Sequence, residues 1–126
     1  MTEDPIQELE SPSLATRSEF QATGATVSLV GDADMDAIQP LGAYLSRLHS
    51  AAMERKCPSI AIDMHELRFI NSSCLKQFVI WVTKVQDLGA GNRYTIVFKP
   101  NPERPTQRWS LTALKALAED VVIIDA

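Results

Sequence analysis

The chain has 126 residues, a net charge of −4 and a hydrophobic content of 45%. This length predicts one domain with a substantial core. The negative charge argues against nucleic acid as the main partner, because binding to phosphates needs clustered Lys and Arg side chains. No run of about 18 apolar residues occurs, so we expect no membrane insertion.

The first thirteen residues differ in composition from the rest of the chain. Residues 1–13 hold four acids, two prolines and few large apolar side chains. We therefore expect a disordered N-terminal tail, followed by one domain over residues 14–126. The acidic N-terminus does not resemble a secretory signal. Two cysteines, Cys57 and Cys74, cannot form a disulfide framework, so we expect reduced thiols and a cytoplasmic location.

The first half of the domain predicts a hairpin followed by a helix. Residues 14–20 and 25–30 are strand candidates, and residues 21–24 suit a hairpin connection between them. Residues 31–34 end the second strand. Asp36 and Gln39 are spaced like a capping box, although Pro40 is also typical of a first helical turn. Helical spacing is then kept by Ile38, Leu41, Leu45, Leu48 and Ala52.

The second half predicts two more helices between strands. Residues 59–64 have the composition of a buried strand, and residues 73–87 have a broad apolar arc and a polar face. Ile80 is the exception, in the middle of that polar face. Gly89 and Gly91 end this helix. The remaining pattern is a strand over 94–99, a loop with Pro102 and Pro105, a short helix marked by Leu111, Leu114 and Leu117, and a buried strand over 121–124.

The element order is therefore β-β-α-β-α-β-α-β. An alternation of this kind predicts an α/β fold, with a mixed, mostly parallel β-sheet and helices packed on it.

Residues 67–75 are the most informative stretch, because two adjacent hydroxyls lie where the apolar helix begins. A serine at such a junction can cap the helix. It also lies where free amides and the helix macrodipole stabilise an anion. Ser72 and Ser73 are therefore either helix caps or the seat of a phosphate.

Motifs for catalysis and metal binding are incomplete. Asp32, Asp34 and Asp36 imitate a calcium loop, but the required glycine and final carboxylate are replaced by alanines. Asp63 and His65 lie near Ser72 in the sequence, but the nucleophile motif of hydrolases is absent. No zinc spacing and no glycine-rich nucleotide loop occur. We expect no enzyme activity, no metal and no cofactor.

Two apolar positions leave alternatives open. Cys74 would lie in the first helical turn, where the dipole lowers a thiol pKa, so a redox role competes with a role in packing. Ile80 is either an ordinary exposed apolar residue or a partner contact beside the Ser72–Ser73 end of the helix.

The motif around Ser72 resembles the signature of STAS domains, the bacterial anti-sigma-factor antagonists and their relatives. In that signature, Val-x-Leu-Asp-Leu precedes Leu-x-Phe-Met-Asp-Ser-Ser-Gly-Leu. This chain has Ile-Ala-Ile-Asp-Met over 60–64 and Leu-Arg-Phe-Ile-Asn-Ser-Ser-Cys-Leu over 67–75. Residues 31–34 are similar to the family's Gly-Glu-Leu-Asp turn, and the element order fits from about residue 14 to the C-terminus. Asn71 replaces the family's Asp, and Cys74 replaces its Gly.

The resemblance implies a STAS-like domain that acts as a binding switch. A partner serine kinase, which is also the anti-sigma factor, would phosphorylate Ser72, with Ser73 as second choice, and a phosphatase would reverse this. The unphosphorylated chain would bind that partner and so regulate transcription. The partner-binding residues implied are Asp34, Asn71, Ser72, Ser73, Cys74, Leu75 and Ile80. The alternative is a STAS scaffold without phosphorylation, or a subunit of a signalling or transport complex.

Overall fold

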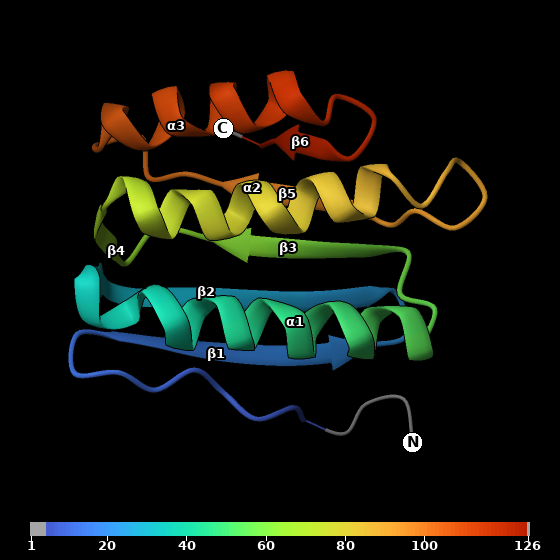
Figure 1. The fold of residues 1–126 in the computed structure, drawn as a ribbon, viewed down its shortest axis with the longest axis horizontal. Helices are drawn as coiled ribbons and strands as arrows, with labels where there is room; N and C mark the ends of the chain where they lie inside the picture. Colours follow the sequence, from blue (N-terminus) through green and yellow to red (C-terminus); the bar gives the residue numbers. More distant parts are fainter. Residues whose placement is uncertain (1–4, 126) are drawn as a thin grey trace.

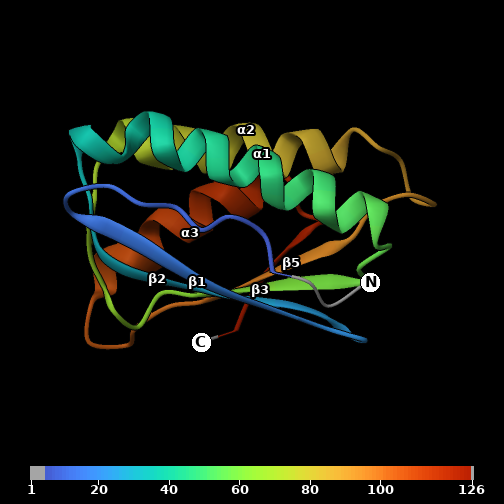
Figure 2. The same ribbon diagram turned by 90° about the horizontal axis from the view of Figure 1, so that it is seen from below.

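The computed structural model describes residues 5–125, which form one mixed sheet covered by helices on one face (Figures 1 and 2). The sheet has the order β1-β2-β3-β5-β6, with β4 paired to β2. Among these strands of residues 5–125, β1 and β2 pair antiparallel and all other neighbours pair parallel. The strands are β1 Leu14–Gln21, β2 Gly24–Ala33, β3 Ser59–Asp63, β4 Leu67–Ile70, β5 Thr95–Lys99 and β6 Val122–Ile124. The helices are α1 Ile38–Glu54, α2 Ser72–Gln86 and α3 Pro105–Leu117, with a short 3₁₀ turn, η1 Met35–Ala37, before α1.

Buried and half-buried side chains alternate along the central strands, so the core lies on one face of the sheet. In β3 and β5 every second side chain is buried under the helices and the others are half-buried on the open face. Successive side chains of a strand point to opposite faces, so this pattern needs a helical layer on only one side. The predicted α/β class and mostly parallel sheet are confirmed. Within residues 5–125, no helix combines the length and apolarity needed to cross a membrane.

The second strand is longer than expected because an unpredicted short strand extends its pairing. Residues 31–34 were expected to end it, yet β2 continues to Ala33 and pairs with β4 after a register shift at Gly31 and Asp32. Gly31 has φ +111°, and a Cβ there would overlap the carbonyl oxygen of Ser13. A glycine is therefore required where the strand changes partners. The actual order has one more strand, β4, than the predicted order.

The helix starts differ from the expected capping pattern. Asp34, and not Asp36, caps η1, because its carboxylate accepts a hydrogen bond from the Asp36 amide at 3.1 Å. Pro40 lies in the first turn of α1, which agrees with the alternative to the Asp36–Gln39 capping box. Pro105, which was expected in a loop, is the first residue of α3, a position that suits proline because its missing N–H would have no intrahelical partner.

The N-terminal segment is packed and hydrogen-bonded where the structure describes it. Residues 1–4 of the expected disordered tail lie outside the described residues. Residues 5–13 precede β1 in the chain and are hydrogen-bonded to it. Leu9 is only 1% exposed, and the Glu8 carboxylate accepts hydrogen bonds from Thr16 and Ser18 of β1. Arg47 of α1 donates to the Gln7 carbonyl oxygen at 3.2 Å. These contacts correct the expectation of disorder for residues 5–13, because Leu9 contributes to the core and the acid has partners.

Candidate functional site

The start of α2 is tied to the loop that follows β2, and together they form one end of the molecule (Figure 1). The Asn71 amide donates to the Ala33 carbonyl oxygen at 2.9 Å. The Cys74 thiol donates to the Asp34 carbonyl oxygen at 3.3 Å. Two segments about forty residues apart in sequence are thus joined by hydrogen bonds beside Ser72. The structure brings the predicted residues Asp34, Asn71 and Cys74 together at this end.

Asn71, and not Ser72, caps α2. Its side-chain oxygen accepts a hydrogen bond from the Cys74 amide at 2.7 Å, and its backbone is extended. The first four amides of a helix lack intrahelical acceptors. Asn71 satisfies the amide of Cys74, and its own amide is bonded to Ala33, which leaves those of Ser72 and Ser73 without an acceptor in the described part of the chain. Of the two interpretations of Ser72, the capping role is therefore wrong, because the cap lies one residue earlier, and the phosphate seat stays a prediction.

Replacing Asn71 with Ala should lower the free energy of unfolding by about 1 kcal/mol, because the Cys74 amide loses its acceptor. Asn71→Asp should keep the cap and the stability, since asparagine and aspartate are equally good at this position. Ser72→Ala is the matched control, because the exposed Ser72 hydroxyl caps nothing. Urea-induced unfolding of the three variants measures the effect, and equal loss in Ser72→Ala and Asn71→Ala would contradict this assignment of the cap.

Asp34 holds the neighbouring loop in place. Its carboxylate oxygen accepts a hydrogen bond from the Ser13 hydroxyl at 2.7 Å in addition to the one from the Asp36 amide. The side chain is half-buried, and both bonds go to its own loop and to the segment before β1. Asp34 therefore positions the loop and places a negative charge beside the start of α2.

Cys74 is a packing residue in this structure. Its side chain is 0% exposed, and burial, together with the nearby Asp34 carboxylate, raises the pKa of the thiol. The expected lowering of the thiol pKa by the helix dipole is thus outweighed by the loss of solvent. The redox alternative has no support in this geometry.

Alkylation with iodoacetamide at pH 7 should modify Cys74 more slowly than Cys57 in the folded chain. Cys57 is 9% exposed and its thiol pKa is also raised by burial, so both reactions should be slow, with access favouring Cys57. The Cys57→Ser and Cys74→Ser variants separate the two rates by mass spectrometry. Faster reaction at Cys74 would restore the redox interpretation.

Ile80 does not share the site around Ser72. It lies eight residues further along α2, about 12 Å at 1.5 Å per residue, and its side chain is 49% exposed. Its expected place beside the Ser72–Ser73 end is therefore wrong. Leu75 lies in the first turn of α2 but is half-buried and packs against the core.

Two exposed apolar side chains flank the site and were not singled out from the sequence. Met35, directly after Asp34, is 81% exposed, and Phe69, two residues before the Asn71 cap, is 53% exposed. Exposed apolar groups on a surface that also carries polar groups are typical of protein interaction sites. Two features of the sequence could have pointed to these residues: Met35 lies between two acids, and Phe69 lies two residues before the helix cap.

The groups needed for hydrolysis or metal binding are not assembled here. His65 and Asp63 bond to each other at 2.6 Å, and no hydrogen bond joins either of them to Ser72. Within residues 5–125, no three His, Cys, Asp or Glu side chains lie in a group that could hold a metal ion.

Comparison with known proteins identifies structures with a similar fold. No family model matches the chain, and no curated protein sequence is similar to it. Solved structures are similar over almost the whole chain. An anti-sigma factor antagonist from Mycobacterium paratuberculosis has 25% identity and a TM-score of 0.58, covering 91% of this chain and 90% of its own. The unphosphorylated form of the anti-sigma factor antagonist SpoIIAA has 19% identity and a TM-score of 0.58, covering 89% of each chain.

The phosphorylated form of SpoIIAA, a Bacillus cell fate determinant, is equally similar. It has 18% identity and a TM-score of 0.58, covering 89% of this chain and 92% of its own. The shared features are the mixed, mostly parallel sheet and its helices, which agree with the element order and strand pairing above. The chain therefore has the STAS fold of the anti-sigma factor antagonists.

Proposed function

We propose that the chain is a phospho-regulated anti-sigma factor antagonist, which binds a partner kinase that is also the anti-sigma factor while Ser72 is unphosphorylated. The observation that carries this proposal is the state of Ser72, which is exposed as the first residue of α2 and free of the capping role. The general role is supported by the likeness to anti-sigma factor antagonists. The chain acts by binding, without catalysis of its own.

A phosphate on Ser72 suits its surroundings. The two amides of Ser72 and Ser73 without acceptors, and the positive end of the α2 macrodipole, both favour an anion there. Lys76, one turn further along α2, is exposed and adds a positive charge on the same side of the helix. Because the hydroxyl contributes no helix cap, its modification leaves the contacts of Asn71 and Cys74 intact.

The regulated step is the change of charge at the docking surface. A phosphoserine carries about −1.5 to −2 charges at pH 7. This charge would enter an interface formed by Asp34, Asn71, Ser72, Ser73 and Leu75, flanked by the apolar Met35 and Phe69, with the buried Cys74 supporting it from below. The Asp34 carboxylate already places one negative charge beside Ser72, so the phosphate would repel an acidic partner group and be costly to desolvate in the interface. The equal likeness to both forms of SpoIIAA supports a switch that changes charge and leaves the fold unchanged.

The test is to incubate the chain with each serine kinase encoded near its gene, together with ATP, and to map the phosphate by mass spectrometry. We expect one phosphate on Ser72, and none on the Ser72→Ala variant. A phosphate on Ser73 alone would move the assignment by one residue. No phosphate with any of these kinases, despite stable binding to a permease or signalling complex, would instead support the scaffold role.

A further inference from the structure

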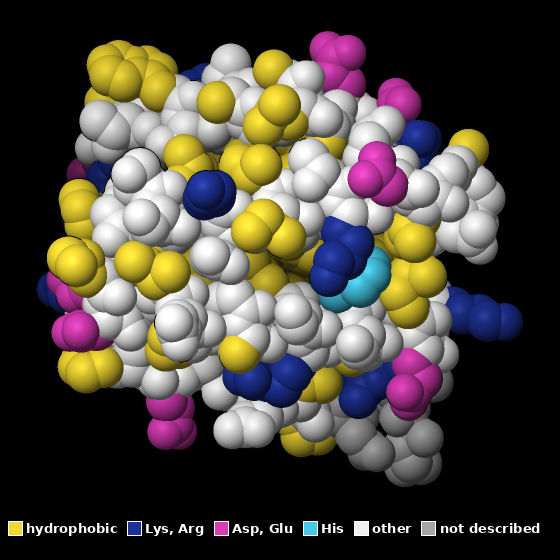
Figure 3. Space-filling view, viewed as in Figure 1, with side chains coloured by type: hydrophobic (Ala, Val, Ile, Leu, Met, Phe, Trp, Pro, Cys, Tyr) yellow, Lys and Arg dark blue, Asp and Glu magenta, His cyan; other side chains and the backbone are white. Residues whose placement is uncertain are grey.

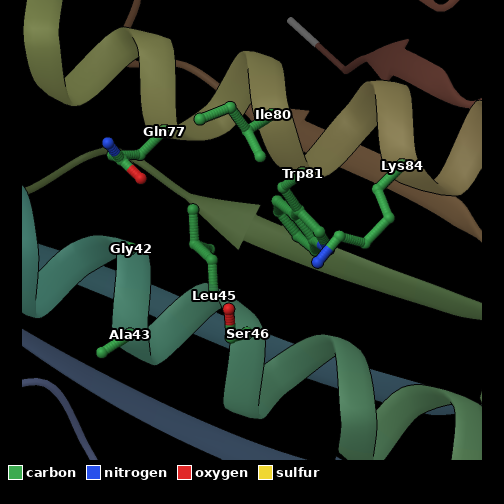
Figure 4. A pocket seen from close by; sticks show the side chains of 8 residues that line it. All are labelled: Gly42, Ala43, Leu45, Ser46, Gln77, Ile80, Trp81 and Lys84. Atoms are coloured by element: carbon green, nitrogen blue, oxygen red, sulfur yellow. The ribbon is translucent and has the colours of Figure 1, made fainter.

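We infer that the groove between α1 and α2 is a second docking surface, which takes an amphipathic, acidic helix of the same partner kinase. The inference rests on the proposed function, and it concerns a surface separate from the Ser72 site. The α1–α2 groove has a volume of about 280 Å³ and is lined by Gly42, Ala43, Leu45, Ser46, Gln77, Ile80, Trp81 and Lys84 (Figure 4).

The side chains on the two walls of the groove differ in size. On the α1 side, Ala43 and Ser46 have small, exposed side chains, whereas the space at Gly42 is filled by Gln77, whose side-chain oxygen lies 2.6 Å from where a Cβ would be. On the α2 side, Ile80 is 49% exposed and borders the opening. The small side chains of Ala43 and Ser46 leave room for another backbone, while the exposed branched side chain of Ile80 provides an apolar contact.

The floor of the groove is apolar and fixed. Leu45 and Trp81 are 4% and 3% exposed. The Trp81 indole N–H donates to the Tyr94 hydroxyl at 2.8 Å, and that hydroxyl bonds to the His49 ring at 2.7 Å. Because the indole is held by these bonds, the floor is preformed, which reduces the entropy lost when a partner binds.

The charge around the groove selects an acidic partner. Among the described residues that line the groove, Lys84 is the only charged one. Lys76 lies one turn before Ile80 on α2, and Lys84 lies one turn after it. The two lysines thus bracket Ile80 along one ridge of α2. Neither ammonium group has an acidic partner among residues 5–125. The chain is negative overall, yet Figure 3 shows cationic side chains around the hollow on this face.

The shape favours a helix over a small ligand. The lining runs from Gln77 to Lys84, about 10 Å along α2, or two turns. Its volume is at or below the lower end of the range for small-molecule pockets. A helix laid along the groove would insert one or two apolar side chains against Leu45 and Trp81 and bring acids one turn away toward Lys76 and Lys84.

The experiment measures binding of the full chain to the kinase that phosphorylates Ser72, by calorimetry at two salt concentrations. We expect Ile80→Glu and Lys84→Glu each to weaken binding by about tenfold or more, as for anchor residues of an interface. Lys84→Glu should also reduce the salt dependence of the affinity. Leu117→Glu is the matched control, because Leu117 is an apolar side chain of α3 with 55% exposure, away from the groove, and should bind like the wild type.

A photo-crosslinking amino acid at the exposed Ala43 should trap a helical, acid-containing segment of that kinase. Affinities of Ile80→Glu and Lys84→Glu equal to that of Leu117→Glu would overturn the inference and leave the Ser72 switch standing. A wild-type chain that neither binds nor is phosphorylated by any candidate kinase would contradict the proposed function, and the groove inference with it. Thermal unfolding of each variant separates loss of binding from loss of fold.

Discussion

Replacing Ser72 with Asp is expected to lower the affinity for the partner kinase by about 100-fold. The added carboxylate would enter the interface beside Asp34, and a repelled or unpaired charge in an interface costs about 3 kcal/mol, which corresponds to that factor. The fold should not suffer, since an acid in the first turn of α2 stabilises the helix by about 0.5 kcal/mol. Calorimetric titration of the kinase with the variant gives the affinity, and thermal unfolding confirms the fold.

Ser50→Asp is the control for this prediction. Ser50 is also an exposed helical serine, but it lies near the end of α1 that is remote from Ser72. The variant adds the same charge and should bind the kinase like the wild type. A Ser72→Asp chain that binds as tightly as Ser50→Asp would exclude charge at Ser72 as the switch.

Replacing Gly31 with Ala is expected to lower the free energy of unfolding by about 3 kcal/mol. Gly31 has φ +111°, which side-chain-bearing residues rarely adopt, and its new Cβ would overlap the Ser13 carbonyl oxygen. That oxygen belongs to the backbone and accepts a hydrogen bond from the Asp32 amide at 2.8 Å, so it cannot simply rotate away. The strain would also reach the functional site, because the Ser13 hydroxyl holds Asp34.

The matched control is Gly91→Ala. Gly91 has no atom within 4 Å of the position of a new Cβ and has no positive φ, so the free energy of unfolding should change by less than about 0.5 kcal/mol. Urea-induced unfolding of both variants measures the difference. Equal midpoints would show that the close approach at Gly31 is relieved by movement of the segment before β1.

Long periodic segments of this chain were predictable from sequence because their burial repeats with the period of the element. The buried residues of α1 and the apolar arc of α2 follow helical spacing, and Ile80 is exposed on the polar face as its position on the helix indicated. The strand β4 was not predictable. It has four residues, and Arg68 and Phe69 are both exposed, so the period-two signal is lost.

The details of the site depended on tertiary contacts that local patterns do not contain. Asn71 and Ser72 are both suitable caps, and the chain path between β4 and α2 decides in favour of Asn71. The apolar arc of α2 indicated a packing role for Cys74, but the hydrogen bond of its thiol to the Asp34 loop could not be predicted from local sequence. The acids of residues 5–13 suggested disorder, yet Glu8 is paired with hydroxyls of β1 that lie at least eight residues away.

The measurement that tests the central claim most directly compares the two forms of the natural chain. The protein would be phosphorylated in full by its kinase, purified, and titrated against that kinase beside the unphosphorylated protein under the same conditions. We predict tight binding of the unphosphorylated form and an affinity at least about 100-fold lower for the form carrying phosphate on Ser72. Equal affinities of the two forms would contradict the account, because the phosphate would then not control binding.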